Sequence, residues 1–202
     1  MMQSTHLMDM LATRRTYRRF DQSRPLGPDV LSDMKHALRL ASCGGNGQAL
    51  RYVFVTDPAL VEAVFPHTHW AAYLPKEVGT PKDGEHPTAY VAVLYDADHK
   101  PGCLDTDAGL AMGNLTLAAW NHGVGSCIMG NIDRPAICDI LGIEKPYAIQ
   151  SMVAFGYPTH TATIVDLPED GSIKYYLDDQ GNYLVPKRAL NDLIRENKAS
   201  KD

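Results

Sequence analysis

The stretch from Asp105 to Asn121 is the feature that most limits how this chain can fold. It predicts a helix over about 106–121, with Asp105 or Thr106 as the N-cap and Gly123 as the terminator. Small residues and large apolar residues are spread around its whole circumference, so no wide polar face remains. Such a helix must be buried nearly all round. In a domain of this size that is easier if a second subunit covers one side.

The length and composition bound the class of protein. The 202 residues fit one domain, and residues 1–202 are predicted to form a single domain. Hydrophobic residues make up 45% and charged residues 21% of the chain, and no segment approaches the roughly 20 apolar residues of a membrane span. The first residues lack the basic lead-in of a secretory signal, so a cytoplasmic location is expected. A net charge of -5 argues against a general nucleic-acid binder.

Helical and strand patterns alternate along the sequence without an internal repeat. Helices are predicted at about 5–13, 28–41, 57–65, 106–121 and 133–141, and strands at 52–56, 89–95, 126–129 and 150–155. The strand at 89–95 is apolar throughout, which predicts an interior strand. The proline- and glycine-rich segment 66–87 predicts a long loop or a partly helical lid. Residues 173–185 predict a hairpin, followed by a final helix from Pro186.

Basic residues gather near the N-terminus although the chain is acidic overall. Five of the nineteen lysines and arginines fall within the first 24 positions. The stretch Arg14-Arg15-Thr16-Tyr17-Arg18 can offer forked, charge-assisted donors to a phosphate. A second pair, Lys187-Arg188, begins the last predicted helix, where backbone N–H groups also favour anions. A solvated helix end is the alternative interpretation of the first cluster.

Two glycine-containing segments are candidates for contact with a ligand. The turn from Gly123 to Gly130 follows a helix and leads into a strand, the reverse of the dinucleotide-binding motif, and its third glycine comes too late. It can instead bring strand backbone close to a flat ligand, or be a plain turn. The loop Ser42 to Gln48 carries amides that can bond a ring edge or ribityl hydroxyls, or it is an unremarkable loop.

Cysteines and histidines do not form a recognisable metal or catalytic motif. No C-x-x-C pair or zinc-ligand spacing links the four cysteines to the histidines, so neither a disulfide scaffold nor a metal site is predicted. His67 and His69 lie in the proline-rich segment without a carboxylate at a fitting spacing. Cys127 has no adjacent base and is predicted to be a buried structural thiol.

Taken in order, these segments resemble the FMN-dependent nitroreductase family along most of the chain. The segments that carry the resemblance are Arg14-Arg15-Thr16-Tyr17-Arg18, Ser42 to Gln48, Asp105 to Trp120, Gly123 to Asn131 with Asp133, and Lys187-Arg188. The resemblance implies an α+β fold with a mixed central β-sheet flanked by helices. It also implies an intertwined homodimer with two FMN sites at the interface.

The resemblance further implies which residues hold the cofactor. The phosphate and ribityl chain are assigned to Arg14, Arg15, Thr16, Arg18, Lys187 and Arg188. The loop that reaches over from the other subunit contains Cys43, Gly44, Asn46 and Gln48. Backbone facing the flavin ring, including a donor to N5, is assigned to Met129, Gly130 and Asn131. No catalytic side chain is implied, although Lys82 is a candidate for neutralising the reduced flavin.

The implied activity is that of an oxidoreductase in which the cofactor carries the chemistry. Electrons pass from NADH or NADPH to FMN and then to a small acceptor, such as a nitroaromatic compound or a quinone, in a ping-pong cycle. The alternatives are another flavin reaction (dehalogenation or flavin breakdown), a non-enzymatic FMN sensor, or a basic interaction module without flavin. Many relatives carry Pro-Trp where this chain has Ala49-Leu50. This departure changes the residues that follow the partner's loop, which the resemblance packs on the flavin ring.

Overall fold

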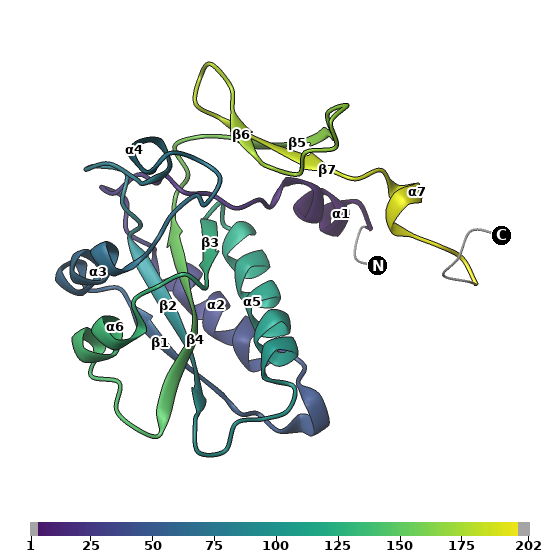
Figure 1. Cartoon of the computed structure of the whole chain (residues 1–202). Helices are drawn as coiled ribbons and strands as arrows, with labels where there is room; N and C mark the ends of the chain where they lie inside the picture. The colour runs from purple at the N-terminus through teal and green to yellow at the C-terminus, as the bar shows by residue number, and fades with distance from the viewer. Residues whose placement is uncertain (1–3, 198–202) are drawn as a thin grey trace. The chain divides into compact units, whose positions relative to one another are not determined.

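The computed structural model describes residues 4–197, and the chain divides by its internal contacts into two compact units (Figure 1). The first unit comprises residues 1–159 and the second residues 160–202. The first contains a four-stranded sheet with its helices, and the second contains a three-stranded sheet. That residues 1–202 act as a single domain stays a prediction.

The four-stranded sheet has the strand order β1-β2-β4-β3, and its strands all pair antiparallel, so the mixed character implied by the resemblance is limited to a parallel bridge at its edge. Its strands are β1 (Leu50–Val55), β2 (Ala89–Asp96), β3 (Gly125–Met129) and β4 (Tyr147–Gly156). The interior position of β2 confirms the prediction from its apolar sequence. β3 is an edge strand, and Thr16 forms an isolated parallel bridge with Ser126 on it. A segment far away in sequence therefore extends this edge of the sheet.

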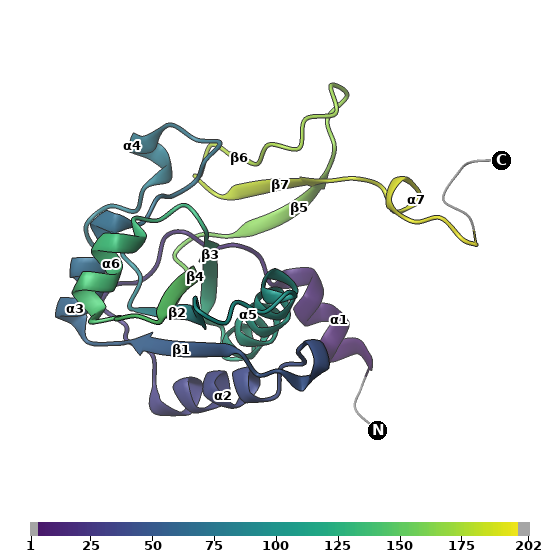
Figure 2. The ribbon, with the colours of Figure 1, turned by 60° about the horizontal axis from the view of Figure 1, so that its bottom comes forward.

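Helices cover both faces of this sheet (Figure 2). One face carries α2 (Pro28–Arg39) and α5 (Leu104–Trp120), and the other carries α3 (Pro58–Val64) and α6 (Arg134–Leu141). Local sequence explains where the helices begin. Proline occupies the first turn of α2, α3 and α6, where the missing N–H costs nothing. Aspartate caps α3 and α6 by accepting from backbone N–H groups.

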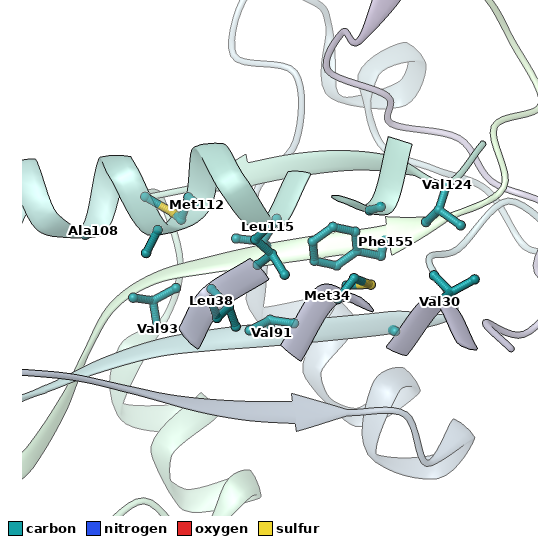
Figure 3. Packing of buried hydrophobic residues seen from close by; sticks show 14 residues of the cluster. Val30, Met34, Leu38, Val91, Val93, Ala108, Met112, Leu115, Val124 and Phe155 are labelled. Atoms are coloured by element: carbon teal, nitrogen blue, oxygen red, sulfur yellow. The ribbon is translucent and has the colours of Figure 1, made fainter. Parts of the chain in front are cut away.

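The core lies between the sheet and the pair α2 and α5 (Figure 3). Met34 and Leu115 project from the two helices toward Phe155 on β4, and all three are fully buried. Val91 and Val93 supply the β2 side of the same cluster. Burying a side chain of this size contributes about 1.5–3 kcal/mol. The helical spacing of apolar residues in 28–41 and the apolar strand at 89–95 are thus explained by one core.

Only one side of α5 is buried within a single chain. Ala111 and Leu115 face the core, whereas Leu110 on the opposite side is 47% exposed. A Cβ atom added to Gly109 or Gly113 would meet nothing within 4 Å. The sequence predicts burial nearly all round, and this is wrong for one chain because no element of the described first unit covers that side. Its coverage by a second chain stays a prediction.

The remaining parts of the first unit are short. The N-terminal helix α1 (Ser4–Thr13) agrees with the prediction. Segment 66–87 is partly helical, as predicted, because it contains the end of the 3₁₀ helix η2 (Phe65–His67) and the four-residue helix α4 (Lys76–Gly79). The loop before β1 contains the 3₁₀ turn η1 (Gly44–Asn46).

The second unit contains β5 (Ala162–Asp166), β6 (Tyr176–Leu177), β7 (Tyr183–Lys187) and the short helix α7 (Leu190–Leu193). β6 and β7 form the predicted hairpin. A final helix from Pro186 is wrong, because β7 continues to Lys187 in parallel pairing with β5. β6 covers only Tyr183 and Leu184, so Pro186 lies where β7 has no neighbour on that side and needs no N–H donor there.

The helices of residues 4–197 are all too short or too polar to cross a membrane.

Candidate functional site

The basic stretch directly follows α1 and closes its C-terminal end. The backbone N–H of Arg14 donates to Met10 at 2.8 Å. Nη2 of Arg15 donates to two carbonyls, that of Leu11 at 2.7 Å and that of Ala12. Cations stabilise the carbonyl end of a helix because its last carbonyls lack intrahelical partners. This part of Arg15 therefore stabilises the helix end, in line with the helix-end alternative for this cluster.

The other side of the Arg15 guanidinium has an unused hydrogen-bond donor. Its Nε is buried and has no hydrogen-bond partner among the described residues. Burial, and then the neighbouring charge of Arg14, lower the pKa of Arg15 from its ordinary value. A guanidinium stays protonated at neutral pH, so two adjacent cations remain, one with an unused buried donor. An anion beside them would supply the missing acceptor, and these residues fit a phosphate.

Tyr17 anchors the basic stretch on the turn after α5. Its ring stacks on Trp120 at 5.1 Å between ring centres, and its backbone N–H donates to Ser126 at 2.9 Å. Trp120 in turn donates from Nε1 to Thr13 Oγ1 at 2.9 Å. A Cβ atom on Gly125 would lie only 2.8 Å from Tyr17 Cδ2, so glycine is needed for this approach. Two motifs that the sequence predicts separately, the basic stretch and the glycine turn, therefore meet at the start of β3.

The residues assigned to the flavin ring lie at the other end of β3. Met129 is buried, whereas Gly130 and Asn131 are exposed. From Ser126 to Gly130 the strand rises about 13 Å. The predicted phosphate end and ring end thus occupy the two ends of one edge strand.

A second segment, which no sequence motif indicates, lies beside this ring end. The backbone N–H of His69 donates to Asn131 at 3.2 Å, and Thr68 forms an antiparallel bridge with Ile132. The side chain of His69 is exposed. In the sequence, His69 stands out only as a residue type that can bind metal, because no local pattern indicates pairing across more than 60 residues. Lys82, the residue suggested for charge neutralisation, is exposed, and its backbone N–H donates to Glu85 at 3.2 Å.

Cys127 lies between the two ends of β3. It is buried, as predicted, and burial raises the pKa of its thiol to about 11, although the charge of Arg18 acts in the opposite direction. The thiol is protonated at neutral pH and is a poor nucleophile. The influence of Arg18 on this thiol indicates that the last arginine of the basic stretch also lies near β3.

The loop Ser42 to Gln48 lies at the opposite end of α5 from the basic stretch. The backbone N–H of Gly44 donates to Asp107 Oδ1 at 2.8 Å in the first turns of that helix. From Asp107 to Trp120, which contacts Tyr17, the helix rises about 20 Å. A cavity of about 190 Å³ opens beneath the loop, with lining residues that include Ser42, Cys43, Gln48, Tyr52, Asp107 and Ala111. One chain therefore does not bring this loop and the basic stretch together.

Lys187 and Arg188 are exposed residues of the second unit, at and just after the end of β7. They do not begin a helix, so the helix N-terminus expected for anion binding is absent there. That they join the basic stretch in holding a phosphate stays a prediction.

No group of three or more potential metal ligands occurs among residues 4–197.

Comparison with known proteins identifies the family to which this fold belongs. The model of the Nitroreductase family matches residues 11–157. The chain belongs to the nitroreductase family, and its α+β fold is that of solved members. A comparison with curated proteins finds no match.

Several solved structures share this fold, and each match covers nearly all of the solved chain. A nitroreductase family protein from Clostridium difficile 630 is 14% identical, with a TM-score of 0.66, over 94% of this chain and 97% of that chain. An FMN-dependent nitroreductase from Clostridium difficile R20291 is 18% identical, with a TM-score of 0.63, over 77% and 90%. A nitroreductase family protein from Streptococcus pneumoniae TIGR4 is 18% identical, with a TM-score of 0.64, over 81% and 96%.

Proposed function

We propose that this protein is an FMN-dependent oxidoreductase that takes electrons from NADH or NADPH and passes them to a small acceptor, such as a nitroaromatic compound or a quinone. The observation that carries the proposal is the arrangement along β3. Arg15, with an unpartnered buried Nε, lies beside Arg14 next to one end of the strand, and Gly130 and Asn131 are open at the other. A protein named as an FMN-dependent nitroreductase shares this fold, which supports the choice of cofactor.

Each part of the site has a distinct task in this proposal. The basic stretch holds the phosphate through charge-assisted donors and the Thr16 hydroxyl, with Lys187 and Arg188 adding charge. The backbone at Met129–Asn131 orients the ring. When bound, FMN would supply the redox chemistry, as a carrier of electrons from the nicotinamide to the acceptor. The protein supplies binding and orientation, and no side-chain acid or base is required.

The site is proposed to be shared by two copies of the chain. The loop containing Asn46 and Gln48 and the basic stretch are both assigned to one FMN, yet they lie about 20 Å apart along α5 in a single chain. A second copy, placed with its loop near the first copy's β3, supplies the missing part. The uncovered side of α5, with Gly109 and Gly113, is the surface available for that copy.

The direct test is to purify the protein and record its visible spectrum before and after adding FMN. A bound flavin that is bleached by NADH or NADPH without oxygen, and restored by a quinone, is the expected result. A colourless protein that takes up no FMN would contradict the flavin site. Bound flavin that neither nucleotide reduces would instead indicate a sensor or another electron donor.

The shared site predicts a distinctive effect of Gly113→Leu. A side chain at this position meets open space within one chain and improves helix propensity by about 0.5–1 kcal/mol, so the fold should be retained. If a second copy packs on α5, the added side chain blocks it. We expect the variant to elute as a monomer and to bind FMN about tenfold or more weakly.

The matched control for this prediction is Gly102→Leu. Gly102 also has open space at its Cβ but precedes α5. Size-exclusion chromatography with light scattering, together with FMN titration, compares the two variants. A dimeric Gly113→Leu protein with normal FMN affinity is incompatible with dimerisation through this side of α5.

A further inference from the structure

Asp107 is a buried carboxylate that no part of the proposed site yet uses. It is only 3% exposed, and both of its oxygens are occupied. Oδ1 accepts the backbone N–H of Gly44 at 2.8 Å, and Oδ2 accepts the thiol of Cys103 at 3.2 Å. A buried charge is costly unless it is hydrogen-bonded. The hydrogen bond from Gly44 therefore stabilises the carboxylate and at the same time holds the loop against α5.

The contact between the loop and α5 is close enough to require glycine. A Cβ atom on Gly44 would lie 2.4 Å from Cys103 Sγ and 3.3 Å from Cys103 Cβ. Any larger residue would push the loop away from the helix and lengthen the bond to Asp107. We call the contact of Gly44 with Asp107 and Cys103 the latch. The latch fixes the start of the loop.

The loop beyond the latch has an unusual backbone. Asn46 and Gln48 have φ angles of 55° and 47°, in the left-handed region that side chains other than glycine rarely adopt. Such conformations persist only where the surrounding structure determines them, and they gather at binding sites. Asn46 and Gln48 are also the residues whose amides are assigned to the flavin. The latch is the contact that holds this strained part of the loop on α5.

We propose that Asp107 is a positioning residue that acts through Gly44 to set the loop of one chain for the flavin held by the other chain's basic stretch. This inference rests on the proposed function and adds a residue outside the flavin-binding motifs. Asp107 does not contact the cofactor; its effect crosses the interface through the loop.

FMN titration of the apoprotein tests the latch without any turnover. Asp107→Ala should weaken FMN binding about tenfold, the ratio that corresponds to losing one hydrogen bond to a charged group. Asp105→Ala is the matched control, because Asp105 lies in the same first turn but is exposed and bonds only Gln150, at 3.3 Å, in the described chain. Gly44→Ala disturbs the latch from the loop side and serves if Asp107→Ala does not fold. Equal affinity of the Asp107 and Asp105 variants would overturn the proposal.

The thiol of Cys103 reports on the latch independently of FMN. Its hydrogen bond to Asp107, followed by burial, raises the pKa of this thiol, and the thiolate is the reactive form. Asp107→Asn removes the negative acceptor, so the pKa should fall and the thiol should be alkylated faster at neutral pH. Iodoacetamide labelling, measured per cysteine by mass spectrometry, gives the rate. An unchanged rate at Cys103 shows that the carboxylate does not hold this thiol.

Mixed dimers decide whether the effect crosses between chains. A chain with Arg18→Ala is co-expressed with a chain carrying Asp107→Ala, each with its own affinity tag. If Asp107 serves the partner's flavin, both defects fall in one site and the other site is intact, so each mixed dimer binds one FMN with wild-type affinity. If Asp107 acts within its own site, both sites are defective and no tight binding remains. A wild-type protein that binds no FMN refutes the proposed function instead, before this comparison begins.

Discussion

The Arg18→Ala variant is expected to bind FMN about 10- to 100-fold more weakly than the wild-type chain. A hydrogen bond to a charged group is worth about 1.5–3 kcal/mol, and each 1.4 kcal/mol changes a dissociation constant tenfold. Arg18 belongs to the stretch that Tyr17 anchors beside β3, and its charge acts on the buried thiol of Cys127. Removal of its guanidinium should therefore act on the phosphate end and leave the strand in place.

Fluorescence titration of apoprotein with FMN measures this effect, and riboflavin provides a second ligand. Because riboflavin lacks the phosphate, its weaker binding should change little in Arg18→Ala. The control variant is Arg24→Ala, since the Arg24 guanidinium already packs 3.4 Å above the ring of Tyr157. Should both variants bind FMN like the wild type, the phosphate is held elsewhere.

Alanine at Gly156 is expected to destabilise the fold by about 1–3 kcal/mol through overpacking. Its Cβ would lie 2.7 Å from Phe20 Cβ and 2.8 Å from Phe20 Cγ, and Phe20 is fully buried. Gly156 pairs with Gly125 across β3 and β4. The ring of Tyr17 packs against Gly125 as closely as Phe20 packs against Gly156. The N-terminal segment thus packs on these two glycines through Tyr17 and Phe20. Neither ring can move away without losing this contact.

Urea unfolding of the FMN-free protein measures this loss, because bound ligand adds stability of its own. Gly102→Ala is the comparison, since its Cβ also meets open space but lies outside α5, so its effect on stability should stay within about 0.5 kcal/mol. Gly156→Ala should therefore unfold at a lower urea midpoint than both Gly102→Ala and the wild type. A Gly156→Ala protein as stable as the wild type would mean that the N-terminal segment does not pack here in solution.

Local sequence patterns predicted most helices and strands because they encode short-range periodicity and caps. Val30, Met34 and Leu38 mark one face of α2, and Asp133 with Gly142 marks both ends of α6. β5 was missed because its short sequence gains its strand geometry only from parallel pairing with β7, which follows much later in the chain. The same pairing extends β7 through Pro186, where the sequence predicted a helix.

The candidate site was predicted as separate motifs, and its connections were not. Arginines, glycines and amides of suitable kind could be recognised one segment at a time. The contacts of Tyr17 with Trp120 and of Gly44 with Asp107 join positions more than 60 residues apart, and no spacing rule encodes them. The position of His69 beside Asn131 was missed for the same reason, since it comes from backbone pairing and not from neighbours in sequence.

The length of α5 carries a constraint of its own. Asp107 near its beginning and Trp120 at its end each hold a different segment of the chain. Inserting one residue between them would rotate one end against the other by about 100° and move it by about 1.5 Å. Either the loop or the basic stretch would then lose its anchor, even though every residue of both remained present. Substitutions on the exposed side of this helix leave the two anchors in phase, whereas a single insertion or deletion puts them out of phase.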